Sequence, residues 1–94
     1  MKFGLEENVY KEIKSALLKF PYIFYIFGSR AKGNYKKTSD IDLAVLEKID
    51  DNEQFKIKNE LDKLNLFYII DIVFVNENTK KELVKSIKKE GVEF

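Results

Sequence analysis

The sequence contains no histidine, no cysteine and no tryptophan, and it has a single arginine, Arg30. Without imidazole and thiol groups there is no histidine or cysteine nucleophile, no imidazole general base and no disulfide. Zinc, haem and iron–sulfur sites built from the usual ligands are excluded for the same reason. Any metal chemistry must use oxygen ligands, which favour Mg²⁺, Mn²⁺ or Ca²⁺.

Excess charge and long apolar runs are also missing. The 17 basic and 16 acidic side chains leave a net charge of +1, whereas dedicated readers of nucleic-acid backbones usually carry a clear basic excess. No apolar run approaches the roughly 18 residues of a membrane span, and the first ten residues have acids where a signal peptide has its apolar stretch. We therefore expect a cytoplasmic protein with no membrane association and no strong nucleic-acid binding.

The chain has 94 residues, of which 45% are hydrophobic. This length and composition predict one globular domain, residues 1–94, with a real core. Since so small a domain buries a smaller fraction of its surface than a larger one, a second protein chain is expected to supply missing surface.

Apolar residues spaced three and four apart predict a helix over residues 5–20, ended by Pro21. Further patterns predict strands at 22–27, 40–46 and 67–75, a helix at 50–65 capped by Asp50 or Asp51, and a helix at 78–90 ended by Gly91. A short helix at 29–32, closed by Gly33, is a further candidate. The predicted fold is α/β, with helices packed on one face of a small mixed sheet.

The first candidate site is Gly28-Ser29, at the end of the apolar strand 22–27. A glycine there lets the backbone approach a phosphate closely, and the Ser29 hydroxyl can donate to its oxygens. The same residues also suit an ordinary turn followed by a helix cap, and the sequence leaves both interpretations open.

The second candidate is the pair Asp40 and Asp42, which strand alternation places on one face, about 6–7 Å apart. Both could reach one divalent ion or a close pair of ions. With six aspartates in the chain, the spacing alone has little weight. The strand context adds to it, because paired carboxylates on a strand repel each other unless a cation compensates.

Asp71 is the third candidate, because it is an ionisable side chain inside an apolar strand, where an unpaired carboxylate is unfavourable. It could complete a three-carboxylate cluster, or simply lie near a strand end or pair with a lysine. Between the two motifs, Arg30 and the lysines Lys32, Lys36 and Lys37 form a basic stretch. It either contacts phosphate or is a solvated loop, whereas the lysines of the last helix are expected to form its exposed face.

The run G-S-R-A-K-G at 28–33, followed by S-D-I-D-L at 39–43, resembles the signature of the DNA polymerase β-like nucleotidyltransferase superfamily. Within it, the chain resembles the minimal nucleotidyltransferase (MNT) type found beside HEPN-domain proteins. The resemblance covers essentially the whole chain and implies a palm-like core. It also implies that Gly28 and Ser29 hold the triphosphate of a nucleotide, beside which Arg30 is the further candidate for nucleotide binding. Asp40, Asp42 and Asp71 are implied as catalytic residues and ligands of two Mg²⁺ ions.

The reaction implied by the resemblance is transfer of a nucleoside monophosphate to an acceptor hydroxyl, with AMP from ATP as the expected case and another nucleoside triphosphate left open. The MNT type implies an antitoxin that modifies a tyrosine of a HEPN toxin partner. Two other functions stay open at this point. One is a non-catalytic module that neutralises its partner by occlusion. The other is a stand-alone nucleotidyltransferase acting on a small molecule.

Overall fold

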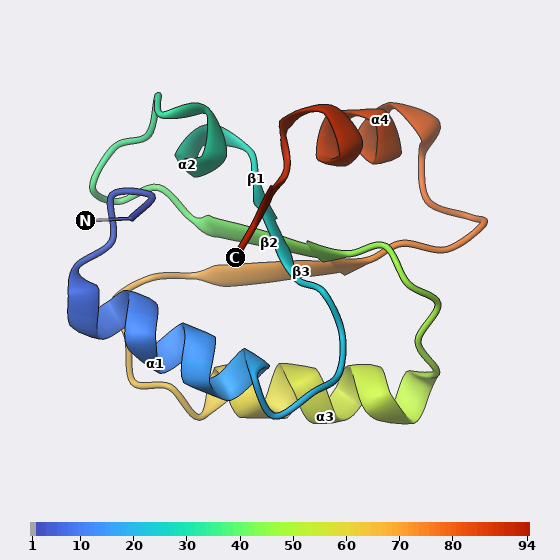
Figure 1. The fold of residues 1–94 in the computed structure, drawn as a ribbon, viewed down its shortest axis with the longest axis horizontal. Helices are drawn as coiled ribbons and strands as arrows, with labels where there is room; N and C mark the ends of the chain where they lie inside the picture. Colours follow the sequence, from blue (N-terminus) through green and yellow to red (C-terminus); the bar gives the residue numbers. More distant parts are fainter. Residues whose placement is uncertain (1) are drawn as a thin grey trace.

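The computed structural model describes residues 2–94, and its helices and strands alternate along the chain (Figure 1). The elements are α1 (Glu7–Leu17), β1 (Tyr25–Phe27), α2 (Ser29–Lys32), β2 (Ile41–Val45), α3 (Asp51–Asp62), β3 (Ile70–Phe74), α4 (Lys81–Glu90) and β4 (Val92–Glu93).

The four strands form one mixed sheet in the order β3-β2-β1-β4. β2 and β3 run parallel, while β1 runs antiparallel to both β2 and β4. The parallel pair is possible because α3 connects β2 to β3 and returns the chain to the same end of the sheet. The predicted α/β class and mixed sheet are thereby confirmed.

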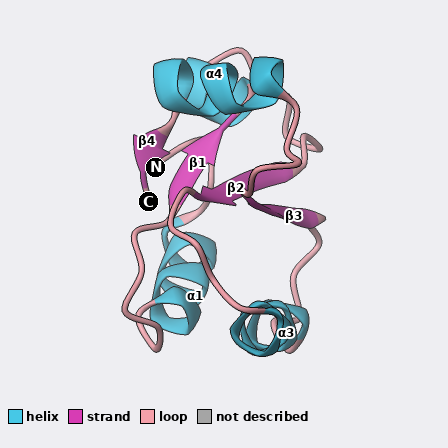
Figure 2. Cartoon of the chain, turned by 90° about the vertical axis from the view of Figure 1, so that its right-hand side faces the viewer, coloured by secondary structure: helices cyan, strands magenta, loops and turns pink. Residues whose placement is uncertain are grey.

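The helices lie on both faces of this sheet (Figure 2). The prediction that all of them pack on one face is right for α1 and α3 but wrong for α4, which covers the opposite face. The reason lies in β2, whose Ala44 alternates with the core-facing Leu43 and is also fully buried. That second face therefore needs cover, and α4 supplies it with Ile87, which is almost fully buried.

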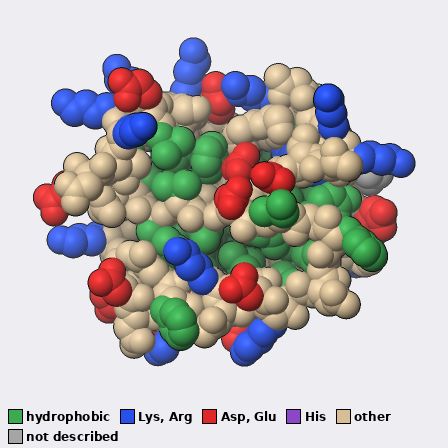
Figure 3. Space-filling view, turned by 180° about the vertical axis from the view of Figure 1, so that it is seen from behind, with side chains coloured by type: hydrophobic (Ala, Val, Ile, Leu, Met, Phe, Trp, Pro, Cys, Tyr) green, Lys and Arg blue, Asp and Glu red, His purple; other side chains and the backbone are tan. Residues whose placement is uncertain are grey.

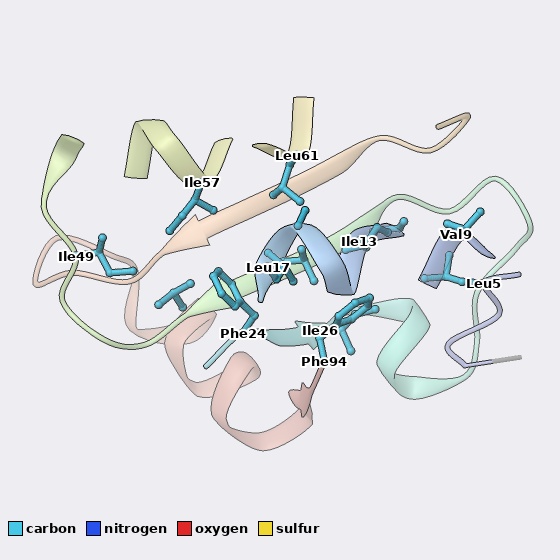
Figure 4. Close-up of a cluster of buried hydrophobic side chains, with 14 residues drawn as sticks. Leu5, Val9, Ile13, Leu17, Phe24, Ile26, Ile49, Ile57, Leu61 and Phe94 are labelled. Carbon is cyan, nitrogen blue, oxygen red and sulfur yellow. The ribbon is translucent and has the colours of Figure 1, made fainter. Parts of the chain in front are cut away.

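The main core lies between the sheet and the pair α1 and α3, as the close-up in Figure 4 shows. Its fully buried members include Ile13 of α1, Ile26 of β1 and Ile57 of α3. At the start of α3 the Asp50 carboxylate accepts a hydrogen bond from the Glu53 amide at 2.8 Å. Asp50 is thus the helix cap, one of the two residues that the sequence left open.

The first strand is shorter than predicted, because β1 begins at Tyr25 rather than at residue 22. Ile23 is 46% exposed, and its amide donates to the Glu47 side chain instead of joining the sheet. The two-residue strand β4 was not predicted. It pairs with Tyr25 and Ile26, and two residues are too few to show a periodicity. None of the helices within residues 2–94 has the length and apolar character needed to cross a bilayer.

Candidate functional site

The sheet brings together the three aspartates that the sequence singled out. Asp42 in β2 lies directly opposite Asp71 in the neighbouring parallel strand β3. Asp40 comes just before β2, and since strand side chains alternate it points to the same face as Asp42. β3 is an edge strand, and its edge lies on the side seen in Figure 3, where acidic side chains gather near the middle beside apolar ones.

Electrostatics distinguish the central aspartate from the other two. Asp40 and Asp71 are exposed, whereas Asp42 is partly buried. Burial raises the pKa of Asp42, and the negative charges of Asp71 and then Asp40 raise it further. Asp40 and Asp71 therefore both lie within electrostatic range of Asp42. The expectation that Asp71 is buried in an apolar strand is not met, because an edge position leaves its carboxylate in water.

Whether this face could bind a divalent cation depends on the oxygen atoms that would be its ligands. Their chemistry is suitable, since carboxylate oxygens are the ligands that Mg²⁺ prefers, and their mutual repulsion would be relieved by a cation. As the side chains stand, however, no three acidic groups within residues 2–94 converge closely enough to hold an ion. The backbone thus places the carboxylates on neighbouring positions, and metal binding would require side-chain rotation.

The predicted glycine turn lies against the central carboxylate. Gly28 follows Phe27, which pairs with Asp42 across β1 and β2. Its φ of 75° and ψ of −154° are accessible essentially only to glycine. A Cβ at this position would lie 2.7 Å from Asp42 Oδ2. Gly28 is therefore required both by the turn and by the close approach of its backbone to the carboxylate.

Ser29 begins the short helix α2, which ends at Gly33 in a left-handed conformation, with φ of 86°. This confirms the predicted strand, turn, short helix and closing glycine. Ser29 is partly exposed, and within residues 2–94 its hydroxyl makes no hydrogen bond to the protein, so it is available to a ligand. Of the loop lysines, Lys32 pairs with Glu90 of α4 at 3.3 Å, while Lys36 and Lys37 are exposed.

The structure corrects the prediction for Arg30. Its side chain is only 2% exposed, and its guanidinium donates four hydrogen bonds to backbone carbonyls. It also lies close to the rings of Tyr35 and Tyr68. A guanidinium engaged in this way does not reach a phosphate. Local sequence could not reveal the burial, because the partners come from three separate parts of the chain.

Most of this fold matches a known protein family. The family model described as "Polymerase beta, Nucleotidyltransferase" matches residues 10–94. The chain belongs to the polymerase β nucleotidyltransferase family. The resemblance read from the glycine turn and the aspartate pair is thereby confirmed, and the chain is a nucleotidyltransferase by family. No curated protein matches the sequence significantly.

Several solved structures share the fold of this chain. A toxin–antitoxin structure containing AMP-PNP matches with a TM-score of 0.66 and 26% identity, over 95% of this chain and 72% of that one. A mutant of the toxin–antitoxin pair MntA–HpeT matches with a TM-score of 0.59 and 26% identity, over 96% and 72%. A protein of Sulfolobus solfataricus described as a nucleotidyltransferase shares the fold, with a TM-score of 0.54 and 24% identity, over 92% and 75%.

Proposed function

We propose that this nucleotidyltransferase transfers AMP from ATP to a hydroxyl of a toxin partner and thereby acts as its antitoxin. The observation that carries the proposal is the joint placement of the glycine turn and the aspartates. Gly28 packs against the carboxylate of Asp42, and Asp42 lies opposite Asp71 in the sheet. A nucleotide held at the turn would therefore lie beside the carboxylates.

Gly28 and Ser29 are the proposed triphosphate-binding residues. The absence of a side chain at Gly28 leaves room for phosphate oxygens near the backbone, and the Ser29 hydroxyl can donate to them. Arg30 has no part in this contact, since it is buried and engaged with backbone carbonyls.

Asp40 and Asp42 would hold two Mg²⁺ ions, and Asp71 would be the third carboxylate ligand. When bound, such ions neutralise charge on the phosphates and on the leaving pyrophosphate. The carboxylates suit this role because they face one side of the sheet without a cationic side chain paired to them among the ion pairs of residues 2–94.

The proposed reaction is an in-line displacement at the α-phosphorus. The acceptor oxygen forms a bond to the α-phosphorus, the bond to the bridging oxygen of the β-phosphate breaks, and pyrophosphate leaves. Asp71 is exposed at the sheet edge, where it can orient the incoming hydroxyl and accept its proton. The protein contributes mainly positioning and charge, which is what phosphoryl transfer requires.

The acceptor is proposed to come from another molecule, because the helices and strands of residues 2–94 are arranged around a single sheet (Figure 1). A toxin partner is supported by the toxin–antitoxin structures that share the fold. The resemblance to the MNT type further suggests a HEPN-domain protein with a tyrosine as the acceptor.

The test is incubation of the protein with ATP labelled at the α-phosphate, Mg²⁺ and the candidate toxin. We expect label on the toxin with the wild type and none with Asp42→Asn. Asp51→Asn, the same change at an exposed position in α3, is the matched control and should retain labelling. No labelling by the wild type, or equal labelling by Asp42→Asn, would contradict the proposal.

A neutralisation assay separates transfer from occlusion. If Asp42→Asn protects cells from the toxin as well as the wild type does, the chain neutralises its partner by binding alone. If the wild type consumes ATP at full rate without any partner, it is a stand-alone enzyme acting on a small molecule.

A further inference from the structure

Arg30 is the one charged residue that is buried within residues 2–94, and its contacts join segments far apart in the sequence. Its Nε and Nη2 donate to the Ser39 carbonyl at 3.1 and 2.9 Å. Nη2 also donates to the Lys37 carbonyl at 3.1 Å, and Nη1 to the Phe3 carbonyl at 2.9 Å. One guanidinium therefore ties α2, the following loop and the N-terminal segment together.

These contacts bridge the two halves of the proposed site. Arg30 directly follows Ser29, the candidate phosphate ligand, and Ser39 directly precedes Asp40, the first candidate metal ligand. Between α2 and Ser39 the chain is a loop of exposed residues, 33–38. By itself such a loop would allow the neighbouring Asp40 to move. The hydrogen bonds from Arg30 to Ser39 remove that freedom.

The loop has few other attachments. Residues 36–39 close on themselves, because the Lys36 amide donates to Ser39 Oγ at 2.8 Å and the Ser39 amide donates to the Lys36 carbonyl at 3.0 Å. Within residues 2–94, the hydrogen bonds that join this turn to other segments all come from Arg30. Apart from the start of β2, where the Ile41 amide donates to the Ile69 carbonyl at 2.9 Å, the turn is held to the rest of the fold by hydrogen bonds from this one side chain.

Two aromatic rings hold the guanidinium in place. Its central carbon lies 5.3 Å from the ring centre of Tyr35 and 5.0 Å from that of Tyr68, within the range of cation–π attraction. Tyr68 lies just before β3, three residues from Asp71, so the arginine is also connected to the strand that bears the third carboxylate. Gly4, with φ of 71°, leaves room for the Tyr35 ring, which a Cβ at this position would contact.

We propose that Arg30 is a positioning residue that holds Asp40 in register with Gly28 and Ser29, so that a divalent cation and a nucleotide can bind together. The inference rests on the proposed function for the identity of the ligands. An arginine is needed because its planar fork can donate to the Lys37, Ser39 and Phe3 carbonyls at once, whereas a lysine presents one nitrogen.

The test uses Arg30→Met, which keeps much of the length but loses the donors, and Arg30→Lys, which keeps a positive charge near the two rings. Leu17→Ala is the control for lost stability, since Leu17 is 4% exposed and lies in the core at the end of α1, with Phe24 and Phe94 lining the same groove. Its melting temperature shows how far the fold is destabilised, and its Mn²⁺ affinity shows how much binding a destabilised protein with an intact site retains. All proteins are compared at a temperature at which each is folded.

Two readouts do not require catalysis. The first is the affinity for Mn²⁺, measured by electron paramagnetic resonance in the presence of α,β-methylene ATP, which cannot release pyrophosphate. The second is amide hydrogen exchange of residues 35–40. Because loss of partners that orient metal ligands typically weakens metal affinity 10- to 100-fold, we expect a loss of about that size for Arg30→Met, a smaller loss for Arg30→Lys, and faster exchange in the loop for both.

The outcomes separate this inference from the proposed function. Leu17→Ala should bind Mn²⁺ with wild-type affinity and exchange its loop at the wild-type rate. If Arg30→Met binds Mn²⁺ like the wild type, or if Leu17→Ala loses as much affinity, Arg30 has no positioning role. If Arg30→Met does not fold, unchanged binding by Arg30→Lys refutes the inference and weakened binding supports it. A wild type that binds no Mn²⁺ also refutes it, whereas one that binds Mn²⁺ but labels no toxin refutes only the proposed acceptor.

Discussion

The substitution Gly28→Ala tests the closest contact between the glycine turn and the carboxylates. The backbone at Gly28 has φ of 75° and ψ of −154°, a region essentially restricted to glycine, where other residues are destabilised by about 1–3 kcal/mol. The added Cβ would also lie 2.7 Å from Asp42 Oδ2, so the carboxylate would have to move. We expect a total loss of about 3 kcal/mol in the free energy of unfolding.

Gly33 provides a matched control. It also has a positive φ, of 86°, but nothing lies within 4 Å of a Cβ placed there. Gly33→Ala should therefore lose only the conformational part, about 1 kcal/mol. Since about 1 kcal/mol corresponds to roughly 4–8 °C in a domain of this size, Gly28→Ala should lower the melting temperature by at least about 12 °C. A stability of roughly 5–14 kcal/mol for 94 residues leaves the variant folded at room temperature.

The assay is thermal denaturation followed by circular dichroism, completed by a double-mutant cycle with Asp42→Ala. Removing the Asp42 carboxylate removes the clash, so Gly28→Ala should be less destabilising in that background by about 0.5–1 kcal/mol. Equal melting temperatures for Gly28→Ala and Gly33→Ala would refute the close contact. So would an unchanged effect of Gly28→Ala when Asp42 is absent.

Two further predictions concern charge and helix capping. Because the pKa of Asp42 is raised in the folded protein, its charge destabilises the fold above that pKa, and the penalty disappears as the pH falls below the unfolded value near 4. Without metal, Asp42→Asn should thus melt a few degrees higher than the wild type at pH 7, and the two proteins should have the same melting temperature at pH 3. Excess Mg²⁺ should raise the melting temperature of the wild type alone. A lower melting temperature for Asp42→Asn at pH 7 would contradict the like-charge argument. Asp50→Ala should lose about 1 kcal/mol by removing the cap that accepts the Glu53 amide, measured by urea denaturation, while Asp51→Ala should lose less.

Much of the fold follows from local pattern. The spacing of apolar residues predicted α1, α3 and α4 to within a few residues, because each helix buries one face and exposes the other. Alternation in β2 correctly placed Asp42 on the face opposite the buried Ile41 and Leu43. The strand starts were predicted less well, since β1 begins at Tyr25 rather than residue 22 and β3 at Ile70 rather than residue 67. A run of apolar residues does not show which of them pair with another strand.

The failures at the site concern residues whose environment is set by distant segments. Asp71 lies in an apolar stretch typical of a buried strand, but it is exposed because β3 became the edge of the sheet. Arg30 lies beside a phosphate-type turn, but its donors are taken by carbonyls from residues 3, 37 and 39. Strand order and loop return are properties of the whole chain, so no local pattern contains them.

The amino-acid sequence sets the chemistry that is available to this protein. Lacking imidazole and thiol groups, it has carboxylates, a glycine turn and a few hydroxyls, and their order along the chain identified the family. The placement of these groups relative to one another depends on the tertiary structure. The parallel pairing of β2 and β3 set Asp42 opposite Asp71, and the packing of three segments around Arg30 turned the only arginine from a candidate phosphate ligand into a buried clamp. The reason is physical: residue type fixes what a side chain can donate or accept, whereas burial and partners depend on contacts between segments distant in sequence.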